Sequence, residues 1–125
     1  MHDGDTLSLR CADRAFKLRL GAVDAPEYRQ AQGQAARNAL ADHLLGRGLR
    51  VESHATDRYG RVIGEIWLDQ QPVSLWLVSQ GWAWCALRAS ETCRTVQHEA
   101  RQQQRGLWQA PAPVEPWTWR AQHPR

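Results

Sequence analysis

The stretch TLSLRCADRAFKLRLGAVDAPE, residues 6–27, decides the fold of this 125-residue chain. Apolar and polar residues alternate over 6–11 and again over 16–23, which is the period of a half-buried β-strand. The intervening CADRA supplies a turn, so 6–23 is predicted to be a β-hairpin that ends before Pro26. Because a hairpin brings its two ends together, Asp5 and Asp24 are expected to meet at one edge of the sheet.

The rest of the chain adds strands and helices without a regular alternation. Apolar side chains at helical spacing from Ala36 to Leu44 predict a helix that Gly46 and Gly48 close. The other expected elements are strands at 49–54 and 61–68, a helix at 72–81, an extended piece at 82–87, and a helix at 90–108 with Ser90 as its N-cap. This order predicts an α+β fold, with a small antiparallel barrel and helices at one end.

The segment APAPVEPWTWR, residues 110–120, is rich in proline and cannot continue a helix. Its Trp117 and Trp119 are expected to pack back onto the body of the protein, although they could instead stack on a nucleobase. We therefore expect a domain at 1–110 followed by a proline- and tryptophan-rich tail at 111–125.

The composition limits the class of protein. A hydrophobic content of 42% suits one globular domain and is too high for a disordered chain. No apolar run approaches the roughly 20 residues that cross a membrane, so no membrane partner is expected. A net charge of +3 favours an anionic partner. The cysteines form no C-x-x-C pair, which argues against zinc, while Cys85 and Cys93 could form a disulfide in an oxidising compartment.

Two carboxylates as close as Asp5 and Asp24 repel unless a cation or proton lies between them. A hard divalent ion with oxygen ligands satisfies this condition, and Ca²⁺ is the first candidate. Glu27, one turn later, could orient or deprotonate a water molecule. Arg19 and Arg61 could neutralise the charge of a phosphodiester, or each could make a surface ion pair worth ~0–1 kcal/mol.

Three ordered motifs, DGDT (3–6), RLGAVDAPE (19–27) and DRYGR (57–61), resemble those of the staphylococcal nuclease (thermonuclease) family. The spacing from the first motif to the second matches that family. The resemblance implies an OB-fold, a five-stranded β-barrel with three helices. It also implies Ca²⁺-dependent hydrolysis of DNA and RNA that cuts the P–O5′ bond and leaves 3′-phosphate ends.

Carried over by position, the resemblance implies a Ca²⁺ site made by the side chains of Asp5 and Asp24 and by the backbone carbonyl of Ala25. A carbonyl ligand does not depend on the type of side chain, so alanine is acceptable there.

The resemblance also gives roles to basic and acidic side chains. Glu27 would be the general base or the water-orienting residue, and Arg19 and Arg61 would stabilise the phosphoryl transition state. Arg58 and Tyr59 would contact a phosphate of the substrate.

Only Met1 and His2 precede the DGDT motif, whereas the family has a full strand there. The first strand is therefore expected to be truncated, or to lie upstream with a signal peptide that would make the protein secreted or periplasmic. We expect a monomer. The alternative function is a catalytically inactive, nuclease-like OB-fold module that binds nucleic acid or protein, but such modules usually lose the acids or arginines that this chain keeps.

Overall fold

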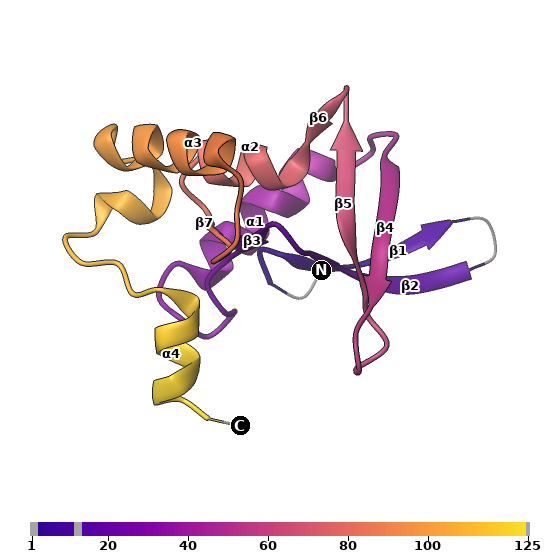
Figure 1. Ribbon diagram of the computed structural model, residues 1–125, viewed down its shortest axis with the longest axis horizontal. Coiled ribbons are helices and arrows are strands. Elements are labelled where there is room, and N and C mark those ends of the chain that lie inside the picture. Colours follow the sequence, from indigo (N-terminus) through magenta and orange to yellow (C-terminus); the bar gives the residue numbers. More distant parts are fainter. Residues whose placement is uncertain (1–2, 12–13, 125) are drawn as a thin grey trace.

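The computed structural model describes residues 3–11 and 14–124 of the chain (Figure 1). Its strands are Thr6–Cys11 (β1), Arg14–Leu20 (β2), Val23–Asp24 (β3), Arg50–Thr56 (β4), Val62–Leu68 (β5), Gln71–Pro72 (β6) and Trp84–Cys85 (β7). Its α-helices are Gly33–Leu44 (α1), Val73–Ser79 (α2), Glu91–Gln102 (α3) and Pro116–Gln122 (α4), and a 3₁₀ helix spans Gly106–Gln109 (η1).

The predicted hairpin is confirmed. Strands β1 and β2 pair antiparallel, with Thr6 opposite Arg19 and Cys11 opposite Arg14, while residues 12 and 13 of the expected turn lie outside the described residues. The second strand is shorter than predicted because the chain bends after Leu20 and resumes as β3, which pairs with β7 in a separate two-stranded sheet.

The main sheet corrects the expected antiparallel barrel. Its strands lie in the order β1-β2-β5-β4, with β6 added to β5, and β2 runs parallel to β5. Parallel neighbours need a long connection, and here the bend, α1 and β4 together supply it. Within the described residues the sheet is open and not a closed barrel, and the α-helices number four where three were expected. Residues 1 and 2 lie outside the description, so the truncated first strand stays a prediction.

The core lies between the sheet and the helices. Leu18 and Leu20 of β2 are fully buried and pack in one cluster with Leu40 of α1 and Leu77 of α2. Alternation along β2 leaves Arg19 on the opposite face, where its side chain is 21% exposed. In the described part of the chain, no helix has the length and apolar character needed to cross a membrane.

The predicted helix at 90–108 is interrupted. Ser90 is its N-cap, as expected, and its side chain accepts a hydrogen bond from the Cys93 amide. The α-helix ends at Gln102, because Gln104 and Gly106 adopt positive φ angles of 54° and 53° that no α-helix continues through. The short helix η1 follows.

The tail does not continue α3, as expected, but it contains a helix of its own that the sequence did not predict. Pro116 occupies the first turn of α4, where a missing N–H costs nothing. Figure 1 shows α4 apart from the other helices, below the body of the molecule. Trp117 packs edge-on against Trp84, with ring centroids 6.4 Å apart, which confirms the expected docking of that tryptophan. Trp119 stacks on His123 at 4.2 Å.

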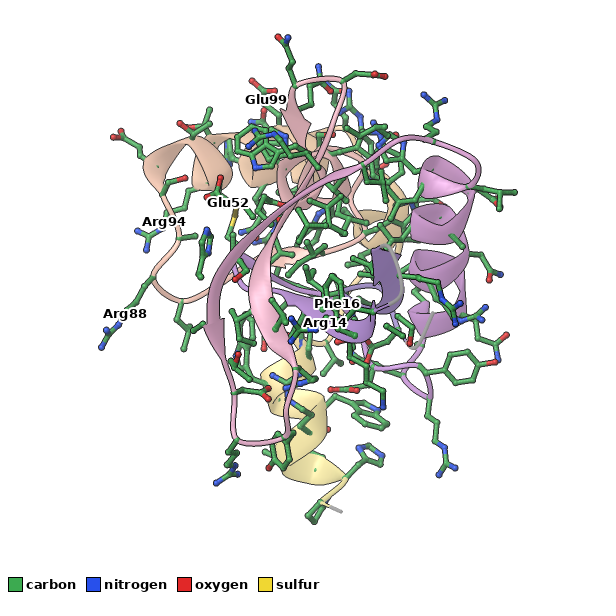
Figure 2. The ribbon with its side chains drawn as sticks, turned by 90° about the vertical axis from the view of Figure 1, so that its right-hand side faces the viewer. Arg14, Phe16, Glu52, Arg88, Arg94 and Glu99 are labelled. Atoms are coloured by element: carbon green, nitrogen blue, oxygen red, sulfur yellow. A yellow bond between two sulfur atoms is a disulfide. The ribbon has the colours of Figure 1, made fainter. Side chains whose placement is uncertain are left out.

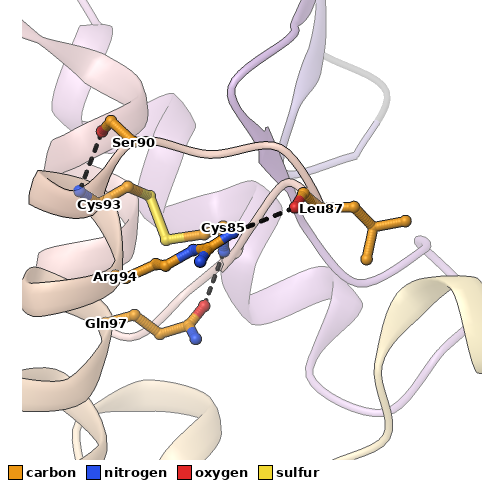
Figure 3. Close-up of a disulfide and its surroundings, with 6 residues drawn as sticks. All are labelled: Cys85, Leu87, Ser90, Cys93, Arg94 and Gln97. Atoms are coloured by element: carbon orange, nitrogen blue, oxygen red, sulfur yellow. Dashed lines mark hydrogen bonds between the residues drawn. A yellow bond between two sulfur atoms is a disulfide. The ribbon is translucent and has the colours of Figure 1, made fainter.

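Cys85 and Cys93 form a disulfide that joins β7 to α3 (Figure 3). The Cys85 amide also donates to the Gln97 side chain of the same helix, at 2.7 Å. Since Cys85 lies opposite Val23 and Trp84 lies opposite Asp24, α3 is tied to the strand that pairs with β3.

Candidate active site

The bend after β2 is held by Arg19. Its Nη1 donates to the carbonyl oxygens of Leu20 at 2.7 Å and Val23 at 3.3 Å, on either side of the bend. The same side chain places Nη2 at 3.4 Å from both Asp5 Oδ2 and Asp24 Oδ1. One guanidinium group therefore closes the bend and gathers the two carboxylates.

The DGDT turn places Asp5 against the start of the next segment. Its backbone oxygen accepts from the Leu20 amide, and its Oδ2 accepts from the Ala25 amide, both at 2.8 Å. Gly4 is required by this packing, because a Cβ there would lie 2.9 Å from the Cβ of Ala25. The hairpin thus brings Asp5 and Asp24 together, as the sequence predicted.

The two hairpin acids belong to a longer chain of alternating charges, Asp5–Arg19–Asp24–Arg120–Glu27, which we call the ion chain. Arg120 comes from α4. Its Nη2 donates to Asp24 Oδ2 at 2.7 Å, and its Nη1 donates to Asp24 Oδ1 at 3.1 Å and Glu27 Oε1 at 3.0 Å. Sequence reasoning missed this arginine, because it gave the segment 110–120 no role beyond the packing or stacking of its two tryptophans.

The acids of the ion chain are largely shielded from water. The side chains of Asp24 and Glu27 are only 12% and 16% exposed. Burial raises the pKa of the Asp5 carboxyl well above its ordinary value, Arg19 opposes this shift, and Asp3 adds to it. The carboxylates of Asp24 and Glu27 raise the pKa of Arg120, so its guanidinium stays charged.

Arg61 has its partner outside the ion chain. The parallel pairing sets Ile63 opposite Arg19, so Arg61, two residues before Ile63, faces the same side of the sheet as Arg19. Its Nε donates to Asp57 Oδ2 at 2.7 Å, and its amide donates to Asp57 Oδ1 at 2.9 Å.

The turn between β4 and β5 carries the remaining predicted residues. Tyr59 is 69% exposed, and its hydroxyl accepts from Arg58 at 2.7 Å. The guanidinium groups of Arg58 and Arg61 lie 4.9 Å and 5.8 Å from the centre of its ring. Desolvation raises the pKa of Asp57, but hydrogen bonds from Arg61 and Tyr59 outweigh it, and the net pKa is lowered. An ionised Asp57 thus holds Arg61 at this turn.

The expected Ca²⁺ ligands are oxygen donors, which suits a hard cation. Among the described residues no group of three or more His, Cys, Asp or Glu side chains is arranged to hold a metal ion. Asp5 and Asp24 nevertheless converge on one cationic group, and the buried Asp3 Oδ1 beside them has no hydrogen-bond partner. Asp5 and Asp24 thus supply carboxylate oxygens of the kind that a hard cation binds.

Members of the ion chain line two surface clefts. The larger has a volume of about 750 Å³ and is lined by Asp3, Glu27, Tyr28, Arg29, Trp119, His123 and Pro124. The smaller, of about 380 Å³, is lined by Arg19, Gly21, Val23, Asp24, Ala86, Leu87, Arg88, Trp117 and Arg120. Figure 2 shows Arg88 extending outward from the molecule, with Arg94 at the same edge of the view. Both clefts combine basic and aromatic side chains, which suits a single-stranded nucleic acid.

Comparisons with known proteins identify the family of this chain. A family model described as staphylococcal nuclease homologue matches residues 17–110. An Escherichia coli protein named "Protein ParB" is 39% identical over 131 residues, covering 94% of this chain and 74% of its own length. An "Uncharacterized endonuclease" of Escherichia coli is 36% identical over 121 residues (94% and 79%). A "Micrococcal nuclease" of Shigella flexneri is 33% identical over 131 residues (94% and 75%). The chain therefore belongs to the staphylococcal nuclease homologue family, as its motifs indicated.

Proposed function

We propose that this protein is a Ca²⁺-dependent nuclease that hydrolyses phosphodiester bonds of DNA and RNA and leaves 3′-phosphate ends. The observation that carries the proposal is the convergence of Asp5, Asp24 and Glu27 on arginine side chains at one end of the hairpin. Relatives named as an endonuclease and a micrococcal nuclease support it.

The acids at the hairpin end would hold the cation. Asp5 and Asp24 would bind Ca²⁺ through their carboxylates and Ala25 through its carbonyl oxygen. When bound, the ion would supply positive charge to the phosphoryl oxygens and help to place the substrate.

Glu27 and the arginines would carry the hydrolysis. Glu27 orients a water molecule and accepts its proton as the water oxygen forms a bond to phosphorus. The P–O5′ bond breaks, and the departing 5′ oxygen takes up a proton from solvent. Arg19 and Arg61 donate hydrogen bonds to the phosphoryl oxygens, where negative charge increases in the transition state. Exposed Arg58 and Tyr59 contact a neighbouring phosphate.

Substitution of the acid and of one arginine tests the assignment. Glu27→Gln should lower the rate of plasmid and RNA cleavage roughly 10²–10⁴-fold, and Arg61→Ala roughly 10²–10³-fold, with unchanged unfolding temperatures. Glu99→Gln and Arg47→Ala change exposed side chains outside the ion chain and serve as matched controls. A chelator should stop the reaction. The product ends should block a polymerase until a phosphatase is added.

The outcomes separate the two candidate functions. Cleavage by Glu27→Gln and Arg61→Ala at the parental rate would show that the site is misassigned or that a contaminant cuts. Binding of nucleic acid without any cleavage by the parent would favour the inactive binding module. Full activity in chelator would exclude the proposed role of the metal.

A further inference from the structure

The tail reaches the acids through two separate contacts. Arg120 donates to Glu27 across 93 residues of sequence and to Asp24 across 96. Gln30 makes the second contact: its Oε1 accepts from the Glu27 amide at 3.1 Å, and its Nε2 donates to the Val114 carbonyl at 2.6 Å. Both the side chain and the backbone of Glu27 are therefore linked to the segment 114–120.

The hydrogen bonds of Arg120 fix the position of the Glu27 carboxylate relative to that of Asp24. Arg120 grips Asp24 with both terminal nitrogens, and the nitrogen that contacts Asp24 Oδ1 also contacts Glu27. A guanidinium group is planar and rigid, so it holds Glu27 at a set place beside Asp24. The helix that carries Arg120 is itself anchored by the packing of Trp117 on Trp84.

We propose that Arg120 is a positioning residue of the active site, which holds the Glu27 carboxylate in the place that hydrolysis requires. The inference rests on the nuclease function proposed above. It also places α4, which lies beyond the residues 17–110 matched by the family, in the working part of the enzyme. A misplacement of about 1 Å at such a group can lower a rate 10²-fold.

A double-mutant cycle tests whether Arg120 acts through Glu27. Arg120→Gln should lower kcat roughly 10–100-fold and change KM by less than about 3-fold, since bound substrate contacts other residues. In the Glu27→Gln background the same substitution should lower kcat by less than about 3-fold, because the carboxylate that Arg120 positions is already absent. Arg120→Lys, which keeps the charge but not the planar fork, should recover part of the loss. Thr118→Ala, on the same helix, should leave kcat near the parental value.

Two results would overturn the proposal. If Arg120→Gln lowers kcat by the same factor in the Glu27→Gln background as in the parent, Arg120 acts independently of Glu27. If kcat is unchanged in Arg120→Gln alone, Arg120 has no role in catalysis. Unfolding temperatures of all variants show whether the fold is kept, and Arg120→Lys supplies the test if Arg120→Gln does not fold.

A readout without cleavage separates this inference from the proposed function. Hydrogen exchange of the 27–30 turn should be faster in Arg120→Gln than in the parent, because the turn loses its contact with α4. A parent protein that cuts nothing would refute the nuclease proposal alone. Exchange of the turn that is unchanged in Arg120→Gln would refute the positioning role, whatever the activity.

Discussion

Asp57 holds Arg61, the predicted catalytic arginine that lies outside the ion chain. It accepts hydrogen bonds from the amides of Tyr59 and Arg61 and from the Arg61 side chain. The carboxylate therefore both shapes the turn between β4 and β5 and aims the guanidinium. Such a support is expected to matter for the rate more than for stability, since the pair lies near the surface.

Asp57→Asn should lower the rate of cleavage by roughly 10-fold, because an amide cannot provide two acceptor oxygens that hold the backbone and the guanidinium together. Asp69→Asn removes the carboxylate of another Arg–Asp pair, Arg47–Asp69, in which both side chains are more than half exposed, and should leave the rate unchanged. Initial rates on a single-stranded oligonucleotide would measure both. Equal cleavage rates for Asp57→Asn and Asp69→Asn would show that Asp57 does not support catalysis.

The residues that sequence reasoning could place are those linked by local geometry. A hairpin fixes its own ends, so Asp5 and Asp24 could be put together from the alternation of apolar residues alone. Arg19 followed from its position between two leucines. Arg120 could not be placed, because its contacts span more than 90 residues and depend on a helix that the prolines seemed to exclude. The partner of Arg61 was only four residues away, yet a D-R-Y-G turn does not show where the arginine points.

At the scale of elements, β7 is the support of the strand that carries Asp24. It pairs with β3 on one side and is bonded to α3 on the other (Figure 3). The bonded cysteines lie eight positions apart in the sequence. A covalent link of this length limits the unfolded chain more than the folded one.

Cys93→Ser should lower the free energy of unfolding by about 2–3 kcal/mol, the value expected from the entropy of a short closed loop. The loss should be seen in urea unfolding followed by tryptophan fluorescence. Reduction of the parent protein should have the same effect, and a reducing agent should not destabilise the serine variant further. A Cys93→Ser variant as stable as the oxidised parent would show that the hydrogen bond from Cys85 to Gln97 and the packing of α3 hold β7 in place without the disulfide.

Most elements could be predicted from periodicity, but their pairing could not. The breaks in β2 and α3 arise where the backbone must turn, at the bend gripped by Arg19 and at the positive φ of Gln104 and Gly106. The parallel pairing of β2 and β5 depends on the path of everything between them, and the alternation within each strand contains no information about its neighbour. An expectation based on hairpins alone therefore gave an antiparallel barrel.

At the scale of the whole molecule, the tail closes a second apolar cluster. Trp84, Ala100, Leu107 and Trp108 are buried together, and Trp117 of α4 packs against them. The rings of Trp84 and Trp108 meet edge-on at 5.2 Å. The tail is thus part of the folded body.

Removal of residues 111–125 should lower the free energy of unfolding by about 2–3 kcal/mol, from the exposed tryptophan surface and the lost ring contacts. It should also lower cleavage at least as much as Arg120→Gln. A chain that stops after Ala121 keeps Trp117 and Arg120 and is the control. Urea unfolding compares the three proteins, and a full-length and a truncated chain of equal stability would contradict the packing described here.

The distance along the sequence from Asp24 and Glu27 to Arg120 also sets the order in which the ribosome makes these partners. A ribosome delivers the carboxylates of Asp24 and Glu27 first and their guanidinium partner more than 90 residues later. A nascent chain whose helix α4 is still in the exit tunnel therefore holds these acids without that partner. If the nuclease function proposed above holds, cleavage should begin only after α4 has left the tunnel, and ribosome-bound chains stalled at increasing lengths would show when it begins.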